Sequence, residues 1–247
     1  MGSKNTVERE PHYRGSFLIE SKHDMARMFR HVSPRYDLLN HLFSLGSDIR
    51  WRRKSARALN FRTGDKILDF GAGTGEFGLA VRNEADVEVV ALDLVPEMLE
   101  KMRLKAGATA DWLSFVVADG EDILFSDNCF DGAVAGFVGR NLFDLRRGLS
   151  EIRRVLKSEG RLGFLEFCRP DSVFMQRMSW LYFRLIVTPL GNLIVSKKLP
   201  SYRYLIDTIE AFYSAGQMRD LFRDVGFRDV HTISLNLGTV ALTVGKK

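Results

Sequence analysis

The stretch that decides the fold is Asp69–Gly78, which reads D-F-G-A-G-T-G-E-F-G and holds two overlapping glycine patterns. Gly73, Gly75 and Gly78 fit G-x-G-x-x-G, the spacing with which a strand-to-helix turn places a dinucleotide pyrophosphate at a helix N-terminus. Gly71, Gly73 and Gly75 fit G-x-G-x-G, with the acidic first residue of the stretch two positions ahead. The two patterns predict different cofactors, and only one of them can be the working frame.

The strand before the glycines separates the two frames. Lys66–Phe70, K-I-L-D-F, is typical of a buried strand, so Gly71 is the first residue past its end. Counting the dinucleotide pattern from Gly71 puts Glu76 where its third glycine should stand. A carboxylate at Asp69 would also repel a pyrophosphate, whereas it suits a cofactor that carries an ammonium and a sulfonium. S-adenosylmethionine (SAM) carries both groups, and the sequence therefore predicts a SAM site.

Two further expected strands end in acidic residues. Asp93 closes Glu88–Asp93, and a carboxylate there accepts hydrogen bonds from ribose hydroxyls. Asp119 closes Leu113–Asp119, where a carboxylate and the next backbone N–H can bind an adenine edge. Each aspartate could instead cap the following helix, but three acids beside one glycine loop favour a cation site. Met98, one turn into the next helix, is either an adenine contact through its thioether or an ordinary core residue.

From Lys66 onward, short apolar runs alternate with helical patterns, which is typical of a parallel sheet covered on both faces. The expected strands are K-I-L-D-F, E-V-V-A-L-D, L-S-F-V-V-A-D, F-D-G-A-V-A-G-F and G-R-L-G-F-L-E-F, and the expected helices are Glu76–Val81, Pro96–Lys105 and Asp144–Lys157. Two last apolar runs are joined only by Leu237-Gly238, which predicts a hairpin. The pattern resembles the α/β fold of class I SAM methyltransferases, which is Rossmann-like. It implies a seven-stranded, mostly parallel sheet with an antiparallel C-terminal hairpin strand and helices on both faces.

Two segments lie outside this alternation. Residues 1–60 look helical, and we expect them to form a lid or substrate segment. Residues 61–247 make up the expected SAM-binding domain. Within it, about 171–215 is too long for an ordinary connection and predicts a helical insert on the substrate side.

The composition limits the class of protein. A chain of 247 residues with 45% hydrophobic and 27% charged residues fits one α/β domain with an appendage. Two cysteines without zinc-ligand spacing favour a reducing cytoplasm and no metal, and no secretory signal pattern is evident. The net charge is +5. Basic runs at 50–57 and 146–157 are either solvated helix faces or contacts for an anionic membrane or nucleic acid.

Four segments, in order along the chain, form a more specific pattern than the glycine loop. They are Tyr36–Trp51 (YDLLNHLFSLGSDIRW), Gly136–Asn141 (GFVGRN), Arg154–Cys168 (RVLKSEGRLGFLEFC) and Tyr202–Phe212 (YRYLIDTIEAF). Together they resemble the ubiquinone/menaquinone biosynthesis C-methyltransferase family over nearly the whole chain. The resemblance implies SAM-dependent C-methylation of a polyprenylated quinol ring, demethylmenaquinol or a related benzoquinol. Asp48 replaces the family's usual histidine, and Gly136 and Cys168 replace serines, which bears on the choice of substrate.

The resemblance also implies roles for individual residues. It places Thr74, Asp93, Asp119 and Gly120 on SAM, with Gly136 offering only backbone. With the residues chosen from the glycine loop, the expected cofactor set is Asp69, Gly71, Gly73, Thr74, Gly75, Asp93, Leu94, Met98, Asp119, Gly120 and Gly136. The expected substrate set is Tyr36, Asn40, Trp51 and Tyr204.

A quinol carbon becomes nucleophilic when its phenol loses a proton, and a free phenol has a pKa near 10. A cation against the oxygen would favour the phenolate. Arg140, after the fourth strand, is the expected catalytic cation. Asn141 beside it could hold a quinol oxygen or the carboxylate end of SAM. Arg140 could instead form a loop ion pair with a nearby acid, and Asn141 could instead cap a helix. His41 is a weaker candidate for a base.

The most apolar stretch, Ser179–Ser196, is a poor transmembrane span because Arg184, Pro189 and Asn192 interrupt it. Within it, Trp180–Val195 is either a groove for the polyprenyl tail or a buried core or dimer helix. With the basic helix, we expect it to dock a cytoplasmic enzyme on membrane. The main alternative is a SAM-dependent methyltransferase of a phospholipid headgroup or another small molecule. A nucleic-acid enzyme is disfavoured because G-F-V-G-R-N lacks an N-P-P-Y segment. An inactive SAM-binding scaffold is the other class considered.

Overall fold

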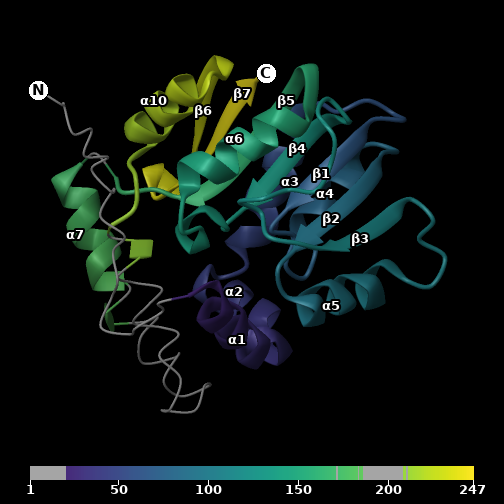
Figure 1. Ribbon diagram of the computed structural model, residues 1–247. Coiled ribbons are helices and arrows are strands. Elements are labelled where there is room, and N and C mark those ends of the chain that lie inside the picture. The colour runs from purple at the N-terminus through teal and green to yellow at the C-terminus, as the bar shows by residue number, and fades with distance from the viewer. Residues whose placement is uncertain (1–20, 171, 183, 186–207, 210) are drawn as a thin grey trace, which may run out of the picture.

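A computed structural model describes residues 21–170, 172–182, 184–185, 208–209 and 211–247 (Figure 1). The strands are β1 (Lys66–Phe70), β2 (Glu88–Asp93), β3 (Leu113–Val117), β4 (Phe130–Gly136), β5 (Leu156–Phe167), β6 (Arg228–Leu235) and β7 (Val240–Lys246). The helices are α1 (Lys22–Val32), α2 (Tyr36–Phe43), α3 (Ser47–Leu59), α4 (Glu76–Glu84), α5 (Pro96–Ala106), α6 (Leu145–Val155), α7 (Val173–Tyr182) and α10 (Ala215–Val225). Short 3-10 turns are η1 (Ser33–Arg35), η2 (Gly139–Asn141) and η4 (Asn236–Gly238).

All seven strands form one sheet in the order β3-β2-β1-β4-β5-β7-β6. The first five are joined by parallel pairings, whereas β7 runs antiparallel to both β5 and β6. The predicted α/β sheet with an antiparallel C-terminal hairpin strand is therefore confirmed. The strand order reverses between β1 and β4, and in open α/β sheets the crevice at such a point is where ligands bind.

Helices cover both faces of the sheet, as predicted (Figure 1). Side chains of α6 and α10 pack with Leu68 and Phe70 of β1 in one core. Side chains of α3, α4 and α5 pack with Ile67 of β1 in the other. Successive residues of a strand face opposite sides, so β1 contributes to both cores and is buried from Ile67 onward.

Some element bounds differ from the predicted ones. The helix expected at Asp144–Lys157 begins one residue later, because the Asp144 side chain accepts the Arg147 N–H and caps it. It ends at Val155, and Leu156 pairs with Phe130 in the sheet. β3 stops at Val117, and α4 continues past Val81 to Glu84.

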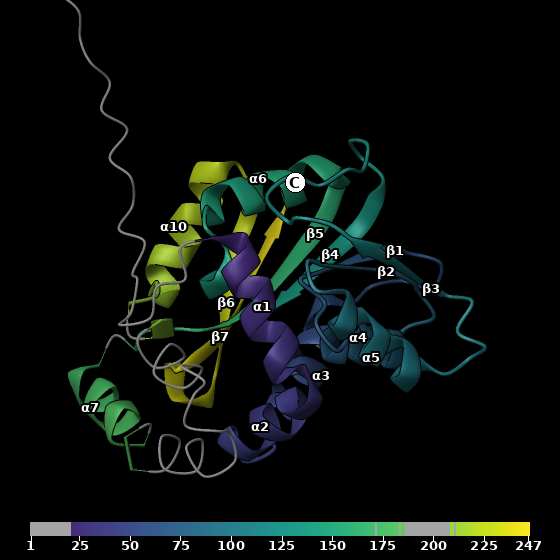
Figure 2. The same ribbon diagram turned by 60° about the horizontal axis from the view of Figure 1, so that its bottom comes forward.

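The segment before β1 is helical, as expected, over its described part. Helices α1, α2 and α3 lie together, and α1 crosses the edge of the sheet at which the parallel strands end (Figure 2). Of the expected insert, the structure describes α7 and a few neighbouring residues, while Tyr204 and most of Trp180–Val195 lie outside the described residues. Among the helices described, none combines the length and the apolar character needed to cross a membrane.

Candidate active site

The glycine loop between β1 and α4 depends on backbone conformations that favour glycine. Gly71 has φ +63° and Gly75 has φ +84°, both in the left-handed region. A Cβ on Gly71 would lie 2.3 Å from Val138 Cγ2, and one on Gly75 would lie 2.2 Å from Met102 Cγ. The G-x-G-x-G frame therefore matches the loop that forms, with glycine required where neighbouring side chains press on the backbone.

Asp69 lies beneath this loop and lines neither of the two cavities described below. Its side chain is 1% exposed and accepts the backbone N–H of Gly78 at 2.9 Å. Burial raises the pKa of Asp69 to about 7, and nearby Asp93 adds to the rise while the Gly78 N–H opposes it. This hydrogen bond fixes the start of α4, and the contact of Asp69 with SAM stays a prediction.

A small cavity of about 100 Å³ opens beside the loop at the ends of β1, β2, β3 and β4. Eight of the expected cofactor residues line it: Gly71, Gly73, Asp93, Leu94, Met98, Asp119, Gly120 and Gly136. Asn141 and Tyr36 line it as well. Thr74 and Gly75 do not belong to its wall. Thr74 is 2% exposed, and its hydroxyl donates to Asp37 Oδ1 of α2 at 2.5 Å.

The donors and acceptors of this loop cavity suit SAM. Asp93 accepts the backbone N–H groups of Gly73 at 2.7 Å and Val95 at 2.8 Å, which leaves carboxylate lone pairs for hydroxyl donors. Burial raises the pKa of Asp93, an environment in which a cationic ligand favours the carboxylate. A Cβ on Gly120 would lie 2.5 Å from Phe70 Cζ, so glycine is required where this part of the cavity wall packs on the Phe70 ring.

A second, larger cavity of about 680 Å³ adjoins the first. Tyr36 and Phe137 line both cavities, and Asn40, Trp51 and Arg140 line the larger one. Its floor is aromatic. Phe137 and Phe167 have ring centroids 4.9 Å apart, and Trp51 lies 6.3 Å from each of them. Of the predicted substrate residues, Tyr36, Asn40 and Trp51 therefore meet at one cavity next to the loop cavity.

The two expected catalytic residues face different cavities. Arg140 lines the larger cavity, where its Nε donates to Glu166 Oε1 at 2.9 Å and both side chains are almost fully buried. Asn141 lines the loop cavity. Cys168, one of the departures from the family pattern, is 3% exposed and also lines the larger cavity.

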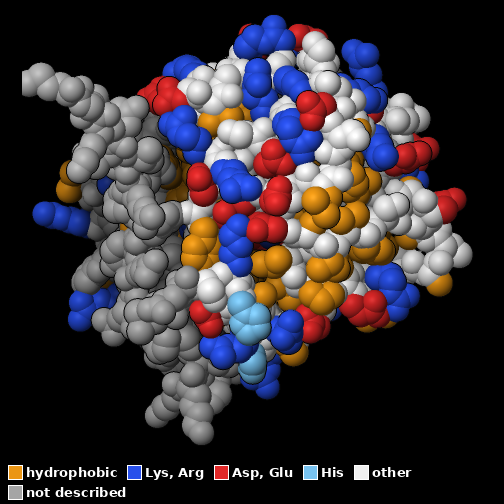
Figure 3. Space-filling view, viewed as in Figure 1, with side chains coloured by type: hydrophobic (Ala, Val, Ile, Leu, Met, Phe, Trp, Pro, Cys, Tyr) orange, Lys and Arg blue, Asp and Glu red, His pale blue; other side chains and the backbone are white. Residues whose placement is uncertain are grey.

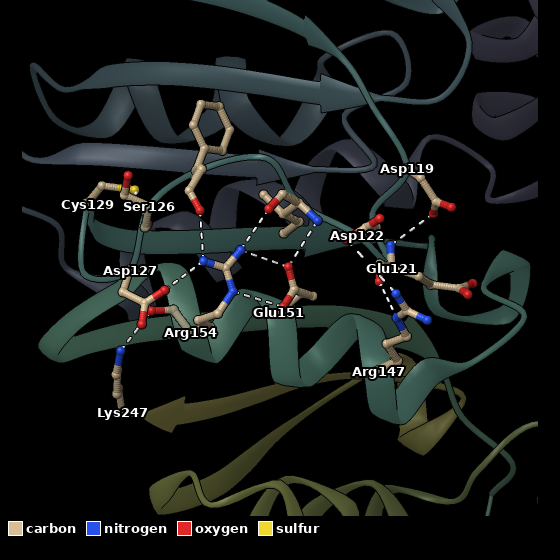
Figure 4. Close-up of polar contacts among 12 residues, drawn as sticks. Asp119, Glu121, Asp122, Ser126, Asp127, Cys129, Arg147, Glu151, Arg154 and Lys247 are labelled. Carbon is tan, nitrogen blue, oxygen red and sulfur yellow. Dashed lines mark hydrogen bonds and ion pairs between the residues drawn. The ribbon is translucent and has the colours of Figure 1, made fainter.

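The basic residues at 146–157 are half-buried or exposed, and each of them contacts an acidic side chain or a backbone carbonyl of the chain. Arg154 donates to Glu151, to Asp127 and to backbone carbonyls, and the Glu151 contact does most to raise its pKa (Figure 4). Arg147 donates to the carbonyl of Glu121 at 2.6 Å (Figure 4). On the face shown in Figure 3, basic and acidic side chains are interspersed. This arrangement supports neither a nucleic-acid surface nor a basic membrane-docking helix at these residues.

The sequence did not single out three contacts that shape the site. Lys22 of α1 reaches Asp119 and Glu121, Asp37 of α2 reaches Thr74, and Arg52 of α3 is buried against Asp48. The first two join residues distant in the chain and leave no local signal. The third could have been found, because Asp48 and Arg52 stand four residues apart on the buried stripe of α3.

This fold, with acidic residues at the strand ends beside a glycine loop, defines a SAM-dependent methyltransferase. The model of the ubiE/COQ5 methyltransferase family matches residues 18–247, and the chain belongs to that family. It is 34% identical over 234 residues to the ubiquinone/menaquinone biosynthesis C-methyltransferase UbiE of Citrifermentans bemidjiense, covering 93% of this chain and 99% of the relative. It is 37% identical over 221 residues to the demethylmenaquinone methyltransferase of Deinococcus radiodurans, covering 89% of this chain and 91% of the relative.

Solved structures agree on the fold. A SAM-dependent methyltransferase of Thermotoga maritima superposes with a TM-score of 0.63 at 18% identity, covering 90% of this chain and 99% of that one. Phosphoethanolamine N-methyltransferase 2 of Haemonchus contortus, solved with S-adenosylhomocysteine, gives a TM-score of 0.58 at 14% identity, covering 78% and 52%. The predicted family, the predicted fold and SAM as the methyl donor are confirmed.

Proposed function

We propose that this methyltransferase transfers the methyl group of SAM to a ring carbon of a polyprenylated quinol of the demethylmenaquinol type. The observation that carries the proposal is the pair of adjoining cavities, which share Tyr36 and Phe137 as a common wall. One cavity has carboxylates suited to SAM, and the other has an aromatic floor suited to a flat ring. The named functions of the relatives in Citrifermentans and Deinococcus support the same chemistry.

In the loop cavity, Asp93 would accept hydrogen bonds from ribose hydroxyls, while Asp119 and the Gly120 backbone would bind adenine. Bound SAM supplies an electrophilic methyl group on a sulfonium. Asp69 would hold the loop in shape through Gly78, and Thr74 would tie the loop to α2 through Asp37. Asn141 would then bind the amino acid end of SAM, since it lines this cavity and not the larger one.

In the larger cavity, Arg140 would hold the quinol oxygen next to the reacting carbon as a phenolate. Glu166 keeps its side chain in place, because Glu166 also accepts the backbone N–H groups of Gly139 and Phe167, each at 2.9 Å. The ring carbon would form its new C–C bond to the methyl group that bound SAM supplies, with S-adenosylhomocysteine as the leaving group, and the proton on that carbon would then pass to water, which restores the aromatic ring. Opposite charges cancel in the transfer, so an aromatic pocket poor in water favours it.

The polyprenyl tail and the membrane would meet the protein at α7. Phe174, Met178 and Leu181 stand at helical spacing on this helix and are 69%, 46% and 41% exposed. Met178 also lines the larger cavity. Binding to vesicles of phosphatidylglycerol tests this. Phe174→Glu should weaken sedimentation with vesicles, whereas Leu104→Glu on the distant α5 should not (Figure 1). Equal binding by the Phe174 variant would contradict membrane contact at α7.

The substrate class is tested with methyl-labelled SAM and a bacterial lipid extract under reducing conditions. We expect the label in a quinone fraction. Label in phosphatidyl headgroups would identify the alternative lipid methyltransferase and overturn the proposal.

A further inference from the structure

Arg52 is a buried cation inside a run of surface arginines. It lies on α3, its side chain is 7% exposed, and it lines the larger cavity. Its neighbour Arg53 is 63% exposed and pairs with Glu84 on the surface. The Arg52 guanidinium carbon lies 5.1 Å from the centre of the Phe137 ring, so the charge sits directly at the aromatic floor.

Asp48, which lines the same cavity, anchors Arg52. Arg52 Nη1 donates to Asp48 Oδ2 at 2.7 Å. The same carboxylate accepts from Ser44 Oγ at 2.7 Å and lies 3.0 Å from His41 Nδ1 through both oxygens. Burial opposes the charge of Asp48, but the contacts with Ser44, His41 and Arg52 keep its pKa below the usual value. Asp48 is therefore a saturated anion that fixes the arginine.

The remaining N–H groups of Arg52 lack a hydrogen-bond partner among the residues that the structure describes. A guanidinium has five donors, and no Arg52 nitrogen is among the fully buried polar atoms without a partner in the described part of the chain, so the unpartnered nitrogens are accessible to a ligand. Because Arg52 lines the cavity, a ligand oxygen in that cavity can receive them.

Arg140, from another part of the chain, has the same kind of surroundings as Arg52. It is held by buried Glu166, and its guanidinium carbon lies 5.4 Å from the centre of the Phe167 ring. Since the Phe137 and Phe167 rings touch, the cavity has two anchored guanidinium groups over adjoining rings. The charges of both arginines act on the Tyr36 side chain, which lies at the wall shared with the loop cavity.

We propose that Arg52 is a second oxygen-binding residue of the substrate site, which binds the quinol hydroxyl on the far side of the ring from Arg140. A para-quinol has two oxygens on opposite ring carbons, and two anchored cations match that pattern. Arg140 takes the oxygen beside the carbon that is methylated, and Arg52 takes the oxygen beside the carbon that bears the tail. The pair selects para-quinols over monophenols. This inference rests on the proposed function.

The test compares two acceptors under reducing conditions, 2-prenyl-1,4-naphthoquinol and 3-prenyl-1-naphthol. The second keeps the hydroxyl beside the reacting carbon and lacks the oxygen assigned to Arg52. For Arg52→Gln we expect kcat/KM on the quinol to fall about 10- to 100-fold, mainly through KM, as for loss of a hydrogen bond to a charged group. On the naphthol, the variant and the parent protein should agree within about twofold, as in a double-mutant cycle.

Three controls keep the outcomes separate. Arg53→Gln, outside the cavity, should leave both activities unchanged. SAM affinity, measured by calorimetry, reports whether each variant is folded. If Arg52→Gln does not fold, the Asp48→Asn/Arg52→Gln double variant replaces it, because it leaves no unpaired charge. An equal loss on both acceptors would overturn the role proposed for Arg52 and leave the proposed function standing. A parent protein that methylates neither acceptor would overturn the proposed function and this inference with it.

Discussion

The Lys22 ammonium of α1 lies 2.5 Å from Asp119 Oδ2 at the end of β3, and 2.8 Å from Glu121 Oε2. Lys22 and Asp119 both line the loop cavity, so this ion pair lies where we propose that adenine binds. Helix α1 is further tied to α5 by Arg30 and Glu97, at 2.7 Å. We therefore predict that the Lys22 contact opens or shifts when SAM enters.

Lys22→Gln is expected to speed SAM association. The pair is partly exposed, with Lys22 at 37% and Asp119 at 33%, and such pairs are worth about 0.2 to 1 kcal/mol. Removing it should raise the association rate by up to about fivefold. Stopped-flow fluorescence measures this rate. Arg27→Gln, on the same helix but paired with Asp24, is the matched control. Slower association in the Lys22 variant would mean that Lys22 itself binds the ligand.

The glycine loop gives a stability prediction. Gly73 and Gly75 both have positive φ, but a Cβ on Gly73 has nothing within 4 Å, whereas one on Gly75 collides with Met102. Gly73→Ala should lower the free energy of unfolding by about 1 to 2 kcal/mol through backbone strain alone. Gly75→Ala should cost about 1 to 3 kcal/mol more through overpacking. Urea denaturation without ligand gives both values, and equal losses would contradict the packing described for the loop.

Asp69 predicts a dependence of stability on pH. Its pKa is raised from 3.8 in the unfolded chain to about 7 in the fold, so the folded protein holds a proton that the unfolded chain releases. The contribution of the protonated Asp69 to the free energy of unfolding is complete below about pH 4, falls as the pH rises to about 7, and is lost above that pH. Relative to Asp69→Asn, the parent protein should lose a few kcal/mol of unfolding free energy between pH 4.5 and 8 (about 1.4 kcal/mol per pKa unit).

A constant difference between the two proteins over that range would show that Asp69 is ionised in the fold throughout. Binding of SAM, a cation, should favour the carboxylate, so SAM affinity should rise with pH toward about 7 in the parent protein. The rise should be smaller in Asp69→Asn. Calorimetry in two buffers would also detect the proton released on binding.

Replacing Arg140 should impair catalysis and leave cofactor binding intact. Arg140→Gln should lower kcat on the quinol by about 100-fold, as for removal of one stabilising donor in an active site. The onset of activity should move to higher pH, because the phenol loses the cation that favours its phenolate. SAM affinity should stay within about twofold, since Arg140 lies outside the loop cavity. Arg161→Gln, whose side chain donates to the Leu59 carbonyl, is a control for loss of a part-buried arginine. An unchanged pH profile would contradict the phenolate role.

The sequence predicted much of the sheet because apolar runs such as Lys66–Phe70 are long and continuous. It also singled out residues at or just after strand ends that line the loop cavity, such as Asp93 and Gly120, and their contact with SAM stays a prediction. It did not predict the partner of Asp69, because strand position alone does not say whether a side chain near the strand end points to a ligand or to a helix N-terminus. Here it points to Gly78.

The sequence did not indicate that Arg52 is buried, because it stands in a run of basic residues. The run Arg50–Lys54 suggests a solvated face, yet Asp48, Trp51, Arg52 and Ser55 follow the helical period of a buried stripe. Lys22 and Asp119 are 97 residues apart, and a contact of that range has no local pattern from which it could be predicted.

The most direct test of the account is to incubate the purified protein with methyl-labelled SAM and reduced demethylmenaquinone, and to locate the label by mass spectrometry and NMR. We expect one new C-methyl group on the unsubstituted ring carbon next to a hydroxyl, with one S-adenosylhomocysteine formed per methyl transferred. An O-methyl ether, or no ring product from a protein that binds SAM, would contradict it.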